Sequence, residues 1–154
     1  MKITDFLTTE AVIPALAARE KNAVLKEMVS ALIANYPTLD AQKVLAVLLE
    51  RERISTTAIG EGVAIPHGKL REVDHVIGIF ARSLNGVDFA SLDGGPTYLF
   101  FVLIAPENAA ADHLKALARI SRLLKDPAFR SRLMEGGNTA RKIFEIIAQE
   151  DQKF

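Results

Sequence analysis

The feature that most constrains the fold is an apolar run, TYLFFVLIA, at residues 97–105. Nearly every position in it is apolar, whereas a strand with one face in water alternates apolar and polar side chains. The run therefore predicts a central strand that is covered on both faces. A sheet built around such a strand needs a layer of helices on each side.

Helical periodicity before and after this strand predicts the covering layers. Apolar residues recur at helical spacing in residues 19–35, and the pattern ends before Pro37. Asp40 is the predicted N-cap of a second helix over residues 41–53. From about residue 109 the pattern is helical again, Pro127 begins a new segment, and a last helix is predicted over residues 138–150. The apolar face expected for the helix after residue 109 consists of Leu114, Leu117, Ile120, Ser121 and Leu124.

A second strand is predicted at residues 75–84, HVIGIFARSL, with Asn85-Gly86 as a turn signal and residues 87–89 as a possible continuation. The chain contains no internal repeat, low-complexity tract or linker. We therefore expect one α/β domain over residues 1–154, with three layers in which a mixed β-sheet is flanked by helices on both faces.

Composition excludes several classes of function. Nineteen basic and nineteen acidic side chains balance, which argues against nucleic acid as a partner. The absence of cysteine removes disulfides, thiolate zinc sites and cysteine nucleophiles. The N-terminal residues lack the apolar core of a signal peptide, and no run approaches the roughly 18 apolar residues of a membrane helix. We expect no membrane insertion and a cytoplasmic location.

Glycine, serine and histidine patterns exclude further chemistries. Gly60-Glu61-Gly62 begins like a dinucleotide fingerprint, but Ile65 occupies the third glycine position. A phosphate loop ending at Gly68-Lys69 also fails, in its spacing and in the residue after the lysine. The sequence has no G-x-S-x-G hydrolase motif. Its three histidines, His67, His75 and His113, lack the spacing of a helical zinc site, so we expect no metal and no cofactor.

His67 is the most unusual of these histidines because it lies between Pro66 and Gly68. Pro66 restricts the backbone before the ring and favours an extended Ile65, whereas Gly68 leaves room for another backbone to approach. These local facts fit an exposed, well-oriented imidazole and fit equally well a turn histidine of no consequence. His75, next to Asp74, is better explained as an exposed turn residue.

A neutral imidazole in such a position can act as a nucleophile, and attack on an activated phosphoryl group would form a phosphohistidine. Thr56 and Thr57 lie nearby in the sequence and could donate hydrogen bonds to the phosphoryl oxygens. His113, near the start of a predicted helix, could orient the nucleophile, although a lone helical histidine is more often a packing or surface residue. Arg51 lies at the end of the second helix, where a cation also has a purely structural role beside the helix dipole.

Across nearly its whole length the sequence resembles the enzyme IIA domains of the mannitol/fructose class in the bacterial phosphoenolpyruvate-dependent phosphotransferase system. The resemblance is strongest in LLERERISTTAIGEGVAIPHGKL, residues 48–70, with support from FFVLIAP and DHLKALARISRLL. It implies that His67 accepts a phosphoryl group on Nε2, with Arg51 as the active-site arginine and His113 as the second histidine. Ala58 and Lys115 depart from residues common in the family.

Within the family the chain looks most like the nitrogen-regulatory enzyme IIA. This form implies phosphorylation of His67 by HPr or its nitrogen-branch paralogue, and regulation of partner proteins, such as potassium-transport or sensor-kinase components, by the phosphorylation state. Such a chain is a phosphotransfer protein rather than an enzyme with ordinary turnover. The alternatives are a sugar-specific enzyme IIA that passes the phosphoryl group to a IIB domain, and a binding module whose His67 is never modified.

Overall fold

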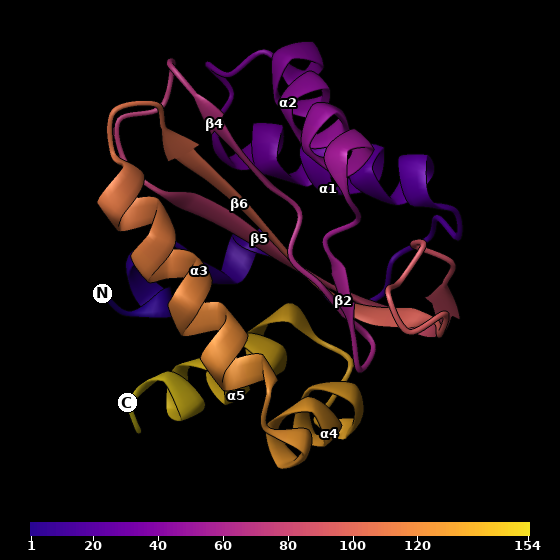
Figure 1. The fold of residues 1–154 in the computed structure, drawn as a ribbon. Coiled ribbons are helices and arrows are strands. Elements are labelled where there is room, and N and C mark those ends of the chain that lie inside the picture. The colour runs from indigo at the N-terminus through magenta and orange to yellow at the C-terminus, as the bar shows by residue number, and fades with distance from the viewer.

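The computed structural model describes residues 1–154 and contains one mixed sheet of six strands. The strand order is β1-β5-β6-β3-β2, and β4 also pairs with β6 (Figure 1). The strands are β1 (Val12–Ile13), β2 (Ala58–Gly60), β3 (Val63–Ala64), β4 (His67–Leu70), β5 (Ile77–Val87) and β6 (Thr97–Pro106). The helices are α1 (Lys21–Asn35), α2 (Ala41–Ile54), α3 (Ala110–Leu124), α4 (Pro127–Glu135) and α5 (Ala140–Asp151), and two short 3₁₀ helices cover Ile3–Asp5 and Thr9–Ala11.

Strand β6 is the central strand, as the apolar run at residues 97–105 predicts. Every residue of β6 except Tyr98 is buried. β6 pairs antiparallel with β5 on one side and parallel with β3 and β4 on the other. The sheet is therefore mixed, and the expected α/β fold with a mixed sheet between helices is confirmed.

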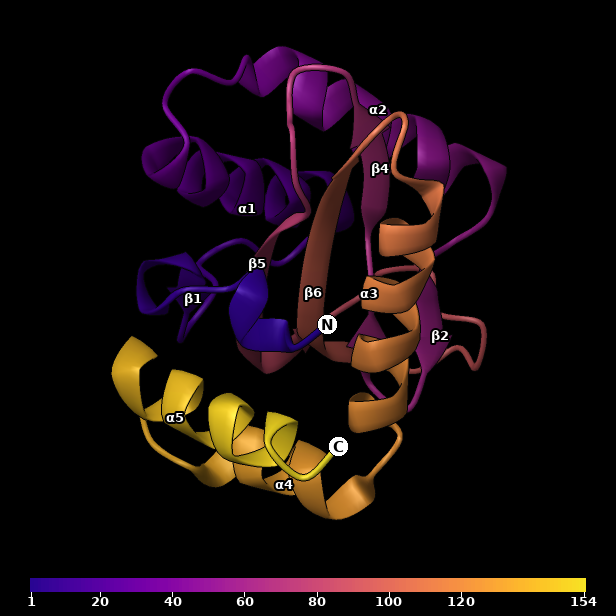
Figure 2. The ribbon, with the colours of Figure 1, turned by 90° about the vertical axis from the view of Figure 1, so that its left-hand side faces the viewer.

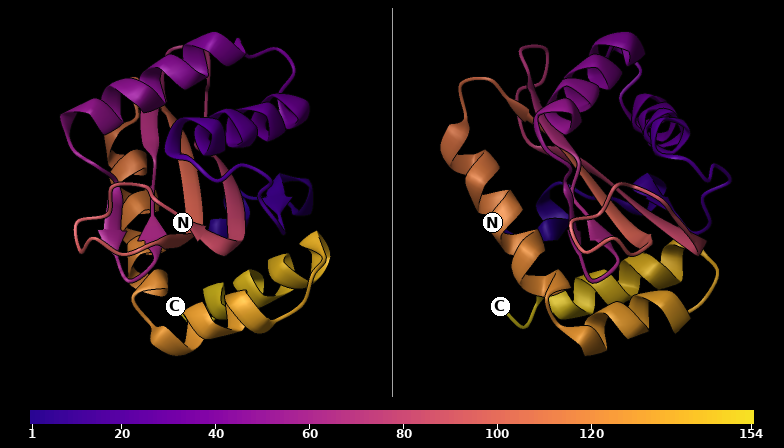
Figure 3. Two further views of the ribbon diagram at one scale, coloured as in Figure 1. Left: turned by 90° about the vertical axis from the view of Figure 1, so that its right-hand side faces the viewer. Right: turned by 45° about the vertical axis from the view of Figure 1, so that its right-hand side comes forward.

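Helices cover both faces of this sheet. α1 and α2 pack together on one face, whereas α3 crosses the opposite face and α4 and α5 lie side by side near its end (Figures 1, 2 and 3). The predicted caps explain where several helices begin. Asp40 accepts hydrogen bonds from the first amides of α2, and Pro127 follows the N-cap Asp126 of α4. No helix is both long and apolar enough to span a bilayer.

The path from β3 to β4 places His67 at an edge of the sheet. Both strands pair with the same side of β6, and the two residues between them, Ile65 and Pro66, are buried. The Pro66 carbonyl accepts a hydrogen bond from the Leu103 amide, and His67 then pairs with Leu103 as the first residue of β4. His67 is thus held in a strand rather than in a turn.

Two details differ from the sequence-based expectations. Asn85-Gly86 does not end the second strand: β5 continues to Val87 through a register shift, with Gly86 in the left-handed region at φ 86°. Such a bulge uses the same left-handed glycine conformation as a hairpin turn, so an Asn-Gly pair is compatible with either structure. Leu114 is 67% exposed, although it was expected on the apolar face of α3. The face that α3 buries is instead rotated by about one residue and contains His113, Ala116, Ile120, Leu123 and Leu124.

Candidate active site

His67 lines an open groove of about 620 Å³ at the β4 edge of the sheet. α2 supplies one wall of the groove and α3 contributes His113, so side chains from the two faces of the sheet meet here. The other lining residues are Ala46, Val47, Glu50, Arg51, Ile54, Gly68 and Lys69. The structure therefore brings together three of the predicted site residues: His67, His113 and Arg51.

The imidazole of His67 is held by its own backbone. Its Nδ1 lies 2.8 Å from the carbonyl oxygen of Ile65. A carbonyl oxygen only accepts hydrogen bonds, so this contact requires a proton on Nδ1. In the neutral ring Nε2 is then unprotonated and carries the free lone pair, which makes Nε2 the nucleophilic nitrogen.

Burial lowers the pKa of His67 below its ordinary value. The hydrogen bond to Ile65 opposes this shift, and the charge of Arg51 acts in the same direction as burial. The charge of Glu52 opposes it. The net effect increases the neutral fraction at neutral pH, which is the form that can attack an electrophile.

His113 is buried beside His67. The two ring centroids lie 5.3 Å apart with the planes at 75°, and His113 is only 6% exposed. Burial, helped by the charges of His67 and Lys69, lowers the pKa of His113 to about 4. Its Nε2 is buried without a hydrogen-bond partner. A neutral ring with an unsatisfied nitrogen next to the nucleophile is a potential hydrogen-bond donor or acceptor for a group bound in the groove.

Arg51 has the helix-end role considered for it and also lines the groove, while its role in binding a phosphoryl group stays a prediction. One guanidinium nitrogen, Nη1, donates to the Ser55 carbonyl at 2.7 Å, just beyond the end of α2, as expected for a helix-end arginine. The same side chain lines the groove and its charge acts on His67. Arg53, by contrast, is exposed and pairs with Glu50.

Thr56 and Thr57 do not line the groove. The Thr56 hydroxyl donates to the Phe89 carbonyl at 3.0 Å. The Thr57 side chain is buried and its hydroxyl donates to the carboxylate of Glu52. Both hydroxyl protons are therefore engaged outside the groove, and a role in binding phosphoryl oxygens stays a prediction for these two residues.

Glu52, which was not predicted from the sequence, organises the segment after α2. This carboxylate is buried, accepts from the amide of Thr57 at 3.0 Å and from its hydroxyl, and pairs with Lys21 at 3.0 Å. Its charge also acts on His67. The only signal in the sequence was an acidic residue between Arg51 and Arg53, which is indistinguishable from an ordinary exposed helix-end charge.

Gly68 allows β4 to approach α2 closely. A Cβ added at this position would lie 3.0 Å from Cγ2 of Val47. The expectation was that another backbone would approach here; the nearest atoms belong instead to the Val47 side chain on α2, and its backbone carbon would lie 3.6 Å from the added Cβ. His75 is exposed, pairs with its neighbour Asp74 and lies edge-on to the ring of Tyr36. No group of three or more His, Asp or Glu side chains is arranged to hold a metal ion.

Comparison with known proteins places these residues in a family. Residues 5–150 match the family model described as "Phosphoenolpyruvate-dependent sugar phosphotransferase system, EIIA 2". A nitrogen regulatory protein of Bradyrhizobium diazoefficiens is 46% identical over 148 residues, which cover 96% of this chain and 95% of that protein. The fructose-specific EIIABC component of Bacillus subtilis is 41% identical over 152 residues, which are 99% of this chain but only 24% of that protein.

Solved structures agree with this assignment. The nitrogen regulatory protein IIA-Ntr of Neisseria meningitidis superimposes with a TM-score of 0.87 and 29% identity, covering 94% of this chain and 98% of that one. The mannitol IIA of Escherichia coli has the same fold, with a TM-score of 0.75, 20% identity, and coverage of 92% and 98%. The chain therefore belongs to the EIIA type 2 family of the phosphoenolpyruvate-dependent sugar phosphotransferase system.

Proposed function

We propose that this chain is a phosphoryl-accepting regulatory protein of the nitrogen branch of the phosphotransferase system, phosphorylated on Nε2 of His67 by an HPr-type phosphocarrier. The observation that carries the proposal is the hydrogen bond from Nδ1 of His67 to the Ile65 carbonyl at 2.8 Å. It orients the ring, holds the proton on Nδ1 and leaves the lone pair on Nε2.

In the proposed step the lone pair of Nε2 forms a bond to phosphorus while the bond from phosphorus to the carrier breaks. The carrier retains the electron pair of the broken bond, and Nδ1 keeps its proton throughout. Phosphoryl transfer depends mainly on positioning and on groups that meet the charge of the equatorial oxygens. Arg51 supplies a cation at the groove, and His113 supplies a neutral ring whose Nε2 has no partner. Thr56 and Thr57 would take part only after leaving their present hydrogen bonds.

The phosphorylation state would then act as the signal. A phosphoryl group adds about −1.5 to −2 charges and three acceptor oxygens, which changes the partner surface that fits the groove. The similarity to proteins named nitrogen regulatory protein along nearly their full length supports a regulatory role. We propose that this role consists of regulating partner proteins in the cytoplasm. Potassium-transport or sensor-kinase components are proposed targets.

A second candidate function is that of a sugar-specific enzyme IIA that passes its phosphoryl group to a IIB domain. It is favoured by the 41% identity to the fructose-specific EIIABC component of Bacillus subtilis. The two functions differ in the acceptor, since a IIB acceptor would remove the phosphoryl group from His67, whereas a regulated partner would bind without removing it.

Phosphorylation is tested by intact-mass spectrometry after incubation with phosphoenolpyruvate, enzyme I and either HPr or its nitrogen-branch paralogue. We expect the wild type to gain one acid-labile phosphoryl group and His67→Ala to gain none, whereas His75→Ala, a matched exposed-histidine control, behaves as the wild type. If the wild type gained no phosphoryl group with either carrier, the proposal would be wrong, and the chain would be a binding module whose His67 is not modified. Adding a fructose-type IIB domain to the phosphorylated chain then separates the two functions by whether the added mass is lost.

A further inference from the structure

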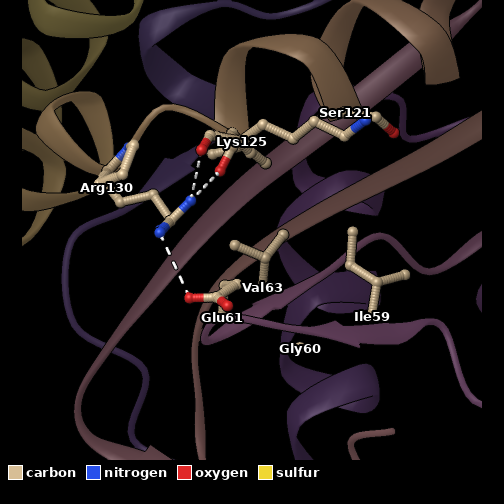
Figure 4. A pocket seen from close by; sticks show the side chains of 9 residues that line it. Ile59, Gly60, Glu61, Val63, Ser121, Lys125 and Arg130 are labelled. Carbon is tan, nitrogen blue, oxygen red and sulfur yellow. Dashed lines mark hydrogen bonds and ion pairs between the residues drawn. The ribbon is translucent and has the colours of Figure 1, made fainter. Parts of the chain in front are cut away.

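A second cavity, separate from the His67 groove, lies between the β2–β3 hairpin and the end of α3. Its volume is about 390 Å³, within the range of small-molecule sites. Figure 4 shows Arg130 beside Glu61 of the hairpin, whereas the Lys125 side chain extends along the end of α3 towards Ser121. The remaining lining residues are Ile59, Gly60, Glu61, Val63, Ser121, Leu124 and Pro127. None of these residues lines the groove of His67.

Arg130 is held in place at this cavity by main-chain carbonyls. Its Nη1 donates to the carbonyls of Leu124 at 2.8 Å and Lys125 at 2.9 Å, where α3 ends (Figure 4). The side chain is only 16% exposed. These bonds orient the guanidinium before any ligand binds, which reduces the ordering cost of recognition. Nη1 thus faces the end of α3, whereas Nη2 faces Glu61 in the β2–β3 hairpin.

Glu61 is the only acidic partner of Arg130, and it is a weak one. Its carboxylate lies 3.5 Å from Nη2 and is 78% exposed, so water screens the pair. Glu61 also has a left-handed backbone at φ 58°, between Gly60 and Gly62, which are both left-handed. The backbone amide of Glu61 donates a hydrogen bond to the Asp93 carboxylate, which holds the tip of the β2–β3 hairpin. A carboxylate in this position can leave the guanidinium without disturbing the core.

Glu61 and Arg130 also line a smaller cavity of about 240 Å³, together with Tyr98, Met134 and Glu135. Pro127 lines both cavities as well, so the two are neighbours. Lys125, at the rim of the larger cavity, is exposed and takes part in no ion pair of the chain.

We propose that this cavity is a binding site for a small organic dianion, a dicarboxylate or a phosphate monoester, which replaces the carboxylate of Glu61 on Nη2 of Arg130 and pairs its second charge with Lys125. Charge-assisted bonds to a pre-oriented arginine are the strong element of such recognition. The apolar part of the ligand would contact Ile59, Val63 and Leu124. Two cations against one displaceable carboxylate favour a dianion over a monoanion.

The site also has a route to His67. The β2–β3 hairpin that carries Glu61 continues directly into Ile65, whose carbonyl holds the imidazole of His67. The Ile65 amide in turn donates to the Thr57 carbonyl at 3.1 Å. A ligand that moves the hairpin tip would therefore change the rate of phosphoryl transfer. This consequence rests on the proposed phosphorylation of His67, whereas binding itself does not.

Binding is tested by amide NMR titration of the full chain with succinate and with glycerol 3-phosphate. Acetate is the monoanion control, and succinamide is the neutral control. We expect saturable shifts at Gly60, Glu61 and Ser121 with one or both dianions and not with the controls. Saturation by inorganic phosphate alone would mean a phosphate site with no recognition of an organic ligand, and would overturn the proposal.

Three variants should change the affinity for the dianion in opposite directions. Lys125→Gln and Arg130→Gln should each weaken dianion binding by about tenfold or more, since each removes a charge-assisted contact. Glu61→Gln should strengthen it severalfold because the competing carboxylate is gone. Lys125→Gln remains decisive if Arg130→Gln unfolds, because the Lys125 side chain makes no ion pair. Arg141→Gln, an exposed arginine on α5, is the matched control and should bind as the wild type.

Two results would overturn the proposal: no saturable shift with either dianion, or dianion affinities that Lys125→Gln, Arg130→Gln and Glu61→Gln all leave unchanged. Failure of phosphorylation would be seen separately, by mass, in the absence of any dianion. If both binding and phosphorylation occur, a change in the transfer rate at saturating dianion, absent in Lys125→Gln, would show that the two sites are coupled.

Discussion

The ring of His67 lies edge-on against the ring of His113, with 5.3 Å between the centroids and 75° between the planes. The two rings come from β4 and from α3, which lie on different layers of the fold. Both have a lowered pKa, so each ring is present mainly in the neutral form at neutral pH. The proposed nucleophile therefore lies against a second ring that is also neutral.

Replacing His113 should slow phosphoryl transfer without abolishing it. His113→Gln keeps a polar side chain at the site but removes the ring that packs against His67. We expect the single-turnover rate from the phosphocarrier to fall about 10- to 100-fold, at or below the usual loss for one transition-state donor. Quench-flow measurement on folded protein, checked by circular dichroism, gives the rate. An unchanged rate would restrict His113 to packing.

Stability should fall as the pH is lowered from about 6.5 to about 4, because His113 has a pKa of about 4 in the folded chain against an ordinary value of 6.5. Between these two pH values His113 is protonated in the unfolded chain but stays neutral in the folded chain, so lowering the pH favours unfolding. The loss is at most about 3 kcal/mol at 1.36 kcal/mol per pKa unit. Urea unfolding at several pH values measures it. His113→Gln should flatten the dependence, and an identical slope in the variant would contradict the assignment.

Thr57→Val separates the two roles considered for Thr57. The bond to Glu52 predicts a structural role, with a loss of about 1–3 kcal/mol in the free energy of unfolding, since the variant leaves a buried carboxylate without one partner. Transfer measured well below the midpoint of unfolding should then change by only a few fold. A large loss of transfer with unchanged stability would instead show that Thr57 contacts the phosphoryl group. Thr56→Val, measured in parallel, tests its neighbour in the same way.

Gly68→Ala should destabilise the chain by about 1–3 kcal/mol, the usual cost of a crowded core substitution. The added Cβ would lie 3.0 Å from Cγ2 of Val47, so the Val47 side chain, or α2 with it, must move by a few tenths of an ångström. Val47→Ala removes the crowded methyl groups. In a double-mutant cycle Val47→Ala should recover part of the stability that Gly68→Ala loses. Strictly additive effects of the two substitutions would mean that crowding against Val47 is not the cause of the loss.

Much of the fold could be predicted because its strongest signals are local. The apolar run at residues 97–105 corresponds to β6 at Thr97–Pro106, and Asp40 and Pro127 mark where α2 and α4 begin. The two-residue strand β1 and the 3₁₀ helices are too short to leave a pattern. Leu114 shows the limit of periodicity, since a shift of one residue in the buried face of α3 left it exposed and His113 buried.

The candidate site was predictable only in part, because its chemistry depends on contacts between distant segments. Pro66 and Gly68 drew attention to His67 but fitted a turn histidine equally well, and only the resemblance to the enzyme IIA domains favoured the phosphorylated histidine. No local pattern could show that Glu52 is buried, that it accepts the Thr57 hydroxyl, or that Lys21 pairs with it from another helix. Arg130 was likewise invisible, because its significance comes from the carbonyls at the end of α3 and from Glu61 in the hairpin.

Whether Nε2 of His67 carries the phosphoryl group while Nδ1 keeps its bond to Ile65 can be measured by long-range ¹H–¹⁵N NMR of the imidazole before and after phosphorylation. We expect a protonated Nδ1 in both states and phosphorus coupling at Nε2 after transfer. Phosphorus on Nδ1, or on any residue other than His67, would show that the proposed site of phosphorylation is wrong.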